Sequence, residues 1–236
     1  MKSCIEDLQK RGYADNAEII KAKSLSQESL LTMLCSDNAV NRTIAAYNLS
    51  ALNEAVVDKL LNQLCIEKCL YTKIAICESL KKGNVAVAEK MLMYLGKIGN
   101  NQYKQLPNKV SAKKSYPLPR DIISRTIGKM NIEIFALLID SFNILDVLKV
   151  SELLDAVGYM AFYNPELVNN NNVKVICGVA EKYYENDLIA WKTLQCLSAF
   201  PVLSSVKFLQ NFYDRDDILG KEAKRSLKII QERLKI

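Results

Sequence analysis

Apolar residues recur at positions i, i+3, i+4 and i+7 along almost the whole chain, and this spacing most strongly limits how it can fold. A period of 3.6 residues places these side chains on one face of an α-helix. Only eight glycines and five prolines occur in 236 residues, so few positions would break a helix. The sequence therefore predicts an all-α protein. The clearest helical stretches are NRTIAAYNLSAL, VAVAEKMLMYLGKI, IEIFALLIDSFNIL and LIAWKTLQCLSAF.

The predicted helices repeat. Each repeat begins with a helix cap followed by a basic or polar residue. A small or apolar residue follows three positions on, and a large apolar anchor comes after it. Successive anchors lie 31, 47, 33, 37 and 30 residues apart. Such spacings are typical of two-helix solenoid repeats, in which stacking buries the apolar face that one helix pair cannot bury alone. The anchors are Leu49, Leu80, Ile127, Met160, Leu197 and Leu227.

We expect about six helix pairs in one domain spanning residues 1–236. The first helix of each pair is placed at about 27–35, 55–64, 86–96, 132–142, 166–182 and 204–213, and the second helices carry the anchors. Residues 1–22 are expected to cap the start of the array, and residues 216–236 to form a basic capping helix at its end. A long loop over residues 99–119, containing three prolines, accounts for the 47-residue spacing.

The pattern D-x-x-V-x-R-x-x-A-x-x-x-L, formed by Asp37, Val40, Arg42, Ala45 and Leu49, resembles the HEAT-repeat family, including its short bacterial-type repeats. The resemblance covers roughly residues 20–232. Later repeats depart from it, since Ala190 and Gly220 occupy the basic position. The resemblance implies an armadillo-type fold, a right-handed α-α superhelix with a concave groove. It also implies a scaffold function for many members, although fold alone does not fix function.

Composition indicates a cytoplasmic protein. No apolar run reaches the roughly 18 residues of a membrane span, and the first twenty residues have no apolar core of a secretory signal. Seven scattered cysteines give no compact disulfide framework. We therefore expect no membrane partner.

The residue types present argue against most catalytic classes. The chain has no histidine, which excludes Ser-His-Asp and Cys-His catalysis within it. Cys65, Cys69 and Cys77 are helically spaced thiols that a soft metal could use, but no tight Cys-x-x-Cys pair completes a zinc site. No phosphate-binding loop or nucleophile elbow occurs. We predict a non-enzyme with no cofactor, no metal and no evident small-molecule substrate.

Charge is unevenly distributed. Residues 99–130 hold seven basic residues and one acidic residue, whereas residues 131–187 hold three basic and nine acidic residues. A concentrated basic segment attracts acidic or phosphate-bearing partners. The other interpretation is a solvated loop. For a binding loop, lysines and arginines would steer the partner and Tyr116 would be an apolar anchor. The predicted binding residues are Lys109, Lys113, Lys114, Tyr116, Arg120 and Arg125.

The first functional hypothesis is a scaffold or adaptor that binds a protein partner along its groove and basic loop. The second is nucleic-acid binding. Here the chain resembles, in size and repeat type, the alkylpurine DNA glycosylases, which surround a cationic lesion with aromatic rings and an acidic residue. That resemblance implies Asp187 and Trp191, one helical turn apart, as the corresponding pair. Trp191 as an ordinary core residue is the competing interpretation. A third hypothesis is a purely structural module.

Overall fold

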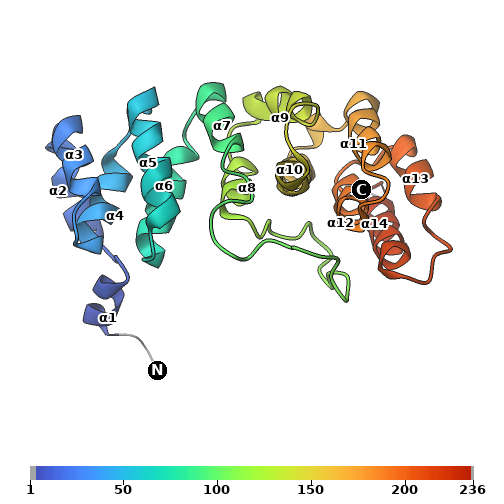
Figure 1. Cartoon of the computed structure of the whole chain (residues 1–236), viewed down its shortest axis with the longest axis horizontal. Coiled ribbons are helices and arrows are strands. Elements are labelled where there is room, and N and C mark those ends of the chain that lie inside the picture. The colour runs from blue at the N-terminus through green and yellow to red at the C-terminus, as the bar shows by residue number, and fades with distance from the viewer. Residues whose placement is uncertain (1–3, 235–236) are drawn as a thin grey trace. The chain divides into compact units, whose positions relative to one another are not determined.

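The structure is a computed structural model that describes residues 4–234, and every regular element in that range is helical (Figure 1). The all-α prediction is therefore confirmed. The chain divides into two compact units, Met1–Met91 and Leu92–Ile236. The boundary falls in helix α7 (Val85–Leu92). The two units are called unit 1 and unit 2.

Unit 1 has two rows of helices. Its elements are α1 (Ile5–Lys10), α2 (Asn16–Lys21), the 3-10 turn η1 (Ala22–Ser24), α3 (Gln27–Leu34), α4 (Ala39–Asn48), α5 (Glu54–Ile66) and α6 (Leu70–Leu80). Helix α4 packs against α6, α3 packs against α5, and each row packs against the other. Side chains of Ser26, Asn38 and Asn53 cap the starts of α3, α4 and α5 by accepting backbone N–H groups.

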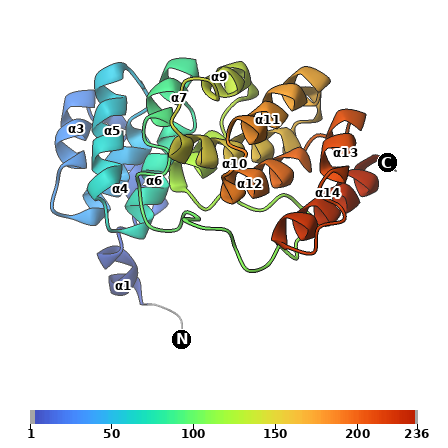
Figure 2. The same cartoon turned by 45° about the vertical axis from the view of Figure 1, so that its right-hand side comes forward.

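Unit 2 repeats this layering over more helices (Figure 2). Its elements are α8 (Ile122–Ile127), η2 (Ile132–Ile134), α9 (Phe135–Ser141), α10 (Val147–Tyr163), η3 (Pro165–Leu167), α11 (Asn170–Lys182), α12 (Asp187–Leu197), α13 (Leu203–Gln210) and α14 (Ile218–Leu234). Helices α8, α10, α12 and α14 pack in succession, and α9, α11 and α13 form the second row. Within the unit, this layering is compatible with a helical solenoid.

The predicted helix positions agree closely with the observed ones. All six anchors are at most 7% exposed, which explains their regular return in the sequence. Two boundaries differ by four residues. Helix α7 stops at Leu92 rather than 96, because tight turns with positive φ at Gly96 and Gly99 follow it. Helix α11 begins at Asn170 rather than 166, because Pro165 starts a separate 3-10 turn.

The expected terminal elements are partly described. Helices α1 and α2 lie in the predicted N-terminal cap, and α14 forms most of the predicted C-terminal helix. Residues 1–3 and 235–236, which belong to the predicted caps, lie outside the described residues. Among the described residues, no helix has both the length and the apolar character needed to cross a membrane.

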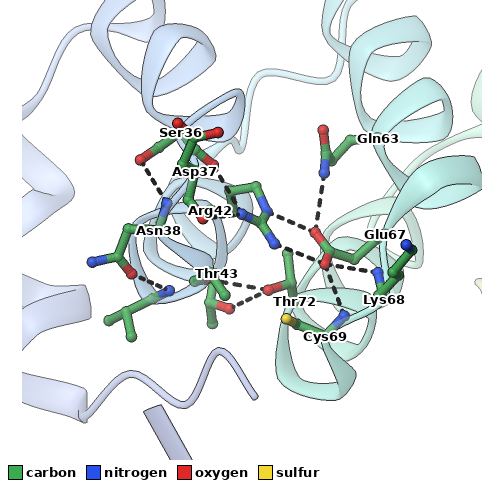
Figure 3. Close-up of polar contacts among 12 residues, drawn as sticks. Ser36, Asp37, Asn38, Arg42, Thr43, Gln63, Glu67, Lys68, Cys69 and Thr72 are labelled. Carbon is green, nitrogen blue, oxygen red and sulfur yellow. Dashed lines mark hydrogen bonds and ion pairs between the residues drawn. The ribbon is translucent and has the colours of Figure 1, made fainter. Parts of the chain in front are cut away.

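In unit 1, the basic residue of the repeat pattern fastens one helix pair to the next (Figure 3). The Arg42 guanidinium donates to both carboxylate oxygens of Glu67, from Nε at 2.8 Å and Nη2 at 2.9 Å. Its Nη1 donates to the carbonyls of Ser36 and Asp37 before α4. Burial raises the pKa of Glu67, but the hydrogen bonds from Arg42 and the backbone outweigh it and hold that pKa at about 2. This basic position is therefore structural here.

Candidate binding surface

The segment between α7 and α8, residues 93–120, carries six basic residues and no acidic residue, and it is called the basic loop below. All six basic side chains are exposed. None forms an ion pair with a carboxylate in the part of the chain that the structure describes. Their charge is therefore available to a partner. They are Lys97, Lys104, Lys109, Lys113, Lys114 and Arg120.

The basic loop lies along the α8, α10, α12 and α14 row of unit 2 and is held near its far end by two contacts. Tyr116 is 2% exposed and packs against Tyr159 and Phe162 of α10, with ring centroids 6.4 and 6.0 Å away. Arg225 of α14 donates from Nη2 to the carbonyls of Lys113 and Ser115 at 3.1 and 3.2 Å. The lysine pair Lys113–Lys114 is thus tied to the helical core.

The two limbs of the basic loop, which are the segments before and after Lys113–Tyr116, are also held by contacts with the helices of unit 2. Gln102 donates from Nε2 to the buried carboxylate of Asp121 at 2.8 Å. That carboxylate also accepts the Ser124 N–H at 2.7 Å and so caps α8. The Tyr103 ring meets Trp191 of α12 edge-on, with centroids 5.1 Å apart, and the Arg120 guanidinium lies 4.4 Å from the Tyr103 ring centroid. The loop is therefore an ordered surface rather than a free tether.

Cavities of unit 2 border the basic loop. One of about 220 Å³ lies between its two limbs, with Asp155, Trp191 and Gln195 among its lining. A second, of about 530 Å³, lies between residues 96–104 and the first turns of α10 and α12. A third, of about 570 Å³, lies between residues 104–106 and the α11–α12 turn. The second and third share Lys104, Asn186 and Leu188, so they adjoin one another.

A buried charged cluster lies beneath the loop. Lys192 of α12 is fully buried, and its Nζ lies 2.8 Å from Glu152 Oε1 and 3.0 Å from Asp155 Oδ2, both on α10. Burial raises the pKa of Glu152 to about 7 and also raises that of Asp155, although Lys192 opposes both shifts. The same two carboxylates outweigh the desolvation of Lys192 and raise its pKa. The cluster joins α10 to α12.

A second buried pair joins α14 to the loop. Glu222 accepts a hydrogen bond from Arg225 Nη1 at 2.7 Å, and Arg225 in turn holds the loop carbonyls. Burial raises the pKa of Glu222, with Arg225 opposing. The Trp191 Nε1 and Glu222 Oε2 atoms are both buried, and Trp191 is close enough to lower the pKa of that carboxyl.

Two of the predicted binding residues make contacts within the protein itself. Tyr116 is not an exposed anchor, because its ring fills the core against α10. Arg125 lies on α8, half-buried, and donates from Nε to the Pro119 carbonyl at 2.9 Å, so it fastens the end of the loop. Lys109, Lys113, Lys114 and Arg120 lie on the exposed face of the loop, as a binding role requires.

The alternative pair, Asp187 and Trp191, lines two different cavities. Asp187 is exposed at the start of α12 and lines the cavity of about 570 Å³. Trp191 is 3% exposed and lines the cavity of about 220 Å³. The carboxylate that shares a cavity with Trp191 is that of Asp155, on the preceding helix of the row.

Sequence reasoning also missed the cluster of Glu152, Asp155 and Lys192. Lys192 lies 40 positions after Glu152 along the chain. The signal present in the sequence was a lysine inside the apolar stretch LIAWKTLQCL, since a buried lysine requires a carboxylate partner. No group of three or more Cys, Asp or Glu side chains in residues 4–234 is arranged to hold a metal ion.

Comparisons with known proteins add little. No protein-family model matches the chain, and no curated protein sequence matches it. Among solved structures, the chain is similar to one described as the crystal structure of an engineered protein, from the Northeast Structural Genomics Consortium. The alignment covers 88% of this chain and 99% of that one, at 17% identity and a TM-score of 0.35. A TM-score this low supports no argument about fold or function.

Proposed function

We propose that the chain is a non-enzymatic scaffold of the cytoplasm that holds a protein partner through an acidic segment bound to the basic loop. The observation that carries this proposal is the loop itself, with six exposed basic side chains, no acid and several buried anchors. A surface held in place before binding loses little conformational entropy when a partner arrives. Unpaired cations on it steer an acidic partner and select against basic ones.

The surroundings of the loop favour a protein segment. Leu148 is 74% exposed and Tyr184 is 76% exposed, and they line the two adjoining cavities beside Lys104. Apolar side chains of a partner would fill these cavities while its carboxylates meet the loop lysines. Apolar anchors surrounded by charge are a usual arrangement in protein interfaces.

Nucleic-acid binding is the second candidate, because the same six cations would also contact phosphates. The aromatic rings give it less support. Trp191 is buried, Tyr116 is buried, and the Tyr103 ring already carries the Arg120 guanidinium. Bases therefore have little aromatic surface on which to stack. Charge reversal at Lys109, Lys113 and Lys114, tested against acidic peptides and nucleic acids in parallel, separates these candidates.

A further inference from the structure

The cavity of about 530 Å³ between the basic loop and the first turns of α10 and α12 has the size of a small-ligand pocket. Four apolar side chains line it, two from each helix start: Val147, Leu148, Leu188 and Ile189. The ring of Tyr103 and the backbone around Gly96 close its loop side. Its mouth includes Leu148, which is 74% exposed. The walls therefore suit an apolar body.

Two polar side chains that line this cavity each carry an oxygen atom without a hydrogen-bond partner. Ser151 is 5% exposed and Glu152 is 2% exposed. The Ser151 hydroxyl and the Glu152 Oε2 atom are both buried without a hydrogen-bond partner. The other oxygen of Glu152 accepts from Lys192 at 2.8 Å. A buried carboxylate oxygen without a donor is costly, so a donor supplied from the cavity would stabilise it.

The charged groups around Glu152 would also favour an additional cation. The groups facing it are Asp155 on its own helix, Lys192 on α12 and Asp121 at the start of α8. Glu152 thus faces two other buried carboxylates and one buried ammonium. Lys97 and Lys104 at the rim are exposed, so water screens their repulsion far more than it screens the buried groups.

We propose that this cavity binds an ammonium group carried on an apolar body, with the ammonium donating to Glu152 and Ser151 and the body packing on Leu148 and Leu188. The same chemistry is offered by a free arylalkyl amine and by a lysine side chain of a protein segment. The inference does not depend on an acidic partner binding the basic loop.

Binding of the ammonium requires Glu152 in its ionised form. Because the pKa of Glu152 is about 7 in the free protein, an amine that remains protonated throughout should bind more tightly as the pH rises from 6 to 8. A ligand without charge should show no such dependence.

The test is calorimetric titration of the full chain with 4-phenylbutylamine, and with 4-phenylbutanol and 4-phenylbutanoic acid as neutral and anionic controls. The amine is expected to bind at least tenfold more tightly than either control at pH 8, and this preference is expected to fall to about twofold or less in Glu152→Gln. Leu148→Lys should weaken amine binding by about tenfold, because it removes an apolar contact and adds a cation at the mouth. Leu203→Lys, at a position 67% exposed on α13 and away from the cavity, should leave binding unchanged.

A second arm uses a five-residue peptide with one central lysine between leucines, and the same peptide with that lysine acetylated. Binding of the unmodified peptide alone identifies a protein lysine as an accepted source, whereas binding of the free amine alone identifies a small molecule. Equal affinity for amine and alcohol, or an amine preference that survives Glu152→Gln, overturns the proposal. Absence of binding by both the amine and the lysine peptide overturns it as well.

Discussion

The hydroxyl oxygen of Tyr116 occupies the space that a side chain at residue 158 would need. A Cβ atom built on Gly158 would lie 2.0 Å from that oxygen and 2.4 Å from the Tyr116 Cζ atom. A glycine in the middle of α10 thus lets an aromatic ring from the basic loop enter the core. The position of the basic loop therefore depends on the glycine at residue 158 of α10.

Gly158→Ala is expected to destabilise the protein by about 1–3 kcal/mol, because overpacking exceeds the gain in helix propensity. Chemical denaturation measures the change. Gly178→Ala in α11 is the matched control, since a Cβ there meets nothing within 4 Å. That control should stabilise by roughly 0.5–1 kcal/mol. Equal effects of the two substitutions would show that Tyr116 does not pack as described.

Arg225→Lys is expected to loosen the loop while keeping a cation beside Glu222. Lysine cannot donate in the forked geometry that reaches both Glu222 and the loop carbonyls. Limited trypsin cleavage after Lys113 or Lys114 should therefore become several-fold faster at native conditions, because local opening exposes the loop. Arg215→Lys, on the exposed pair with Asp217, is the control and should leave the cleavage rate unchanged.

The Arg42–Glu67 pair predicts acid sensitivity. The folded-state pKa of Glu67, about 2, lies below its unfolded value of about 4.3, so its stabilisation is complete above that value and is lost as pH falls toward 2. The contribution is on the order of 3 kcal/mol. Glu67→Gln should remove this part of the unfolding free energy at pH 7 and flatten the profile between pH 4.5 and 2. An unchanged profile would contradict the assignment.

Glu152 predicts that the stability of the protein changes with pH in the opposite direction. Its pKa is raised above the unfolded value, so the folded state binds more protons, and stability declines as pH rises from about 4.3 through about 7. The stability of the Glu152→Gln variant relative to the natural chain should therefore be greater at pH 8 than at pH 5. The difference in relative unfolding free energy should be at least about 1 kcal/mol. Urea denaturation at the two pH values checks this. A gain that is the same at both would mean that Glu152 does not titrate between them.

The helical layering was predictable from the sequence because it depends on local periodicity. Leu80, Ile127 and Leu197 recur at helical spacing and are all fully buried. The site was less predictable. Tyr116 lies in a loop whose sequence does not indicate which side chains face inward, and Lys192 meets Glu152 across 40 residues. Tertiary contacts of that range leave no local pattern.

The central claim is that the basic loop binds an acidic protein segment, and fluorescence anisotropy with a labelled Glu- and Leu-containing peptide tests it most directly. The triple variant with Lys109, Lys113 and Lys114 changed to Glu is compared with a control in which the exposed residues Lys207, Lys221 and Lys228 are changed to Glu. Duplex DNA and single-stranded RNA are titrated in parallel at about 50 and 200 mM salt. The account predicts that the natural chain and the control bind the peptide, that the loop variant loses at least tenfold, and that nucleic acids bind more weakly. Equal peptide binding by the two variants would contradict the claim that the basic loop binds an acidic segment. Tight, steeply salt-dependent binding of nucleic acid alone would instead support the nucleic-acid-binding function.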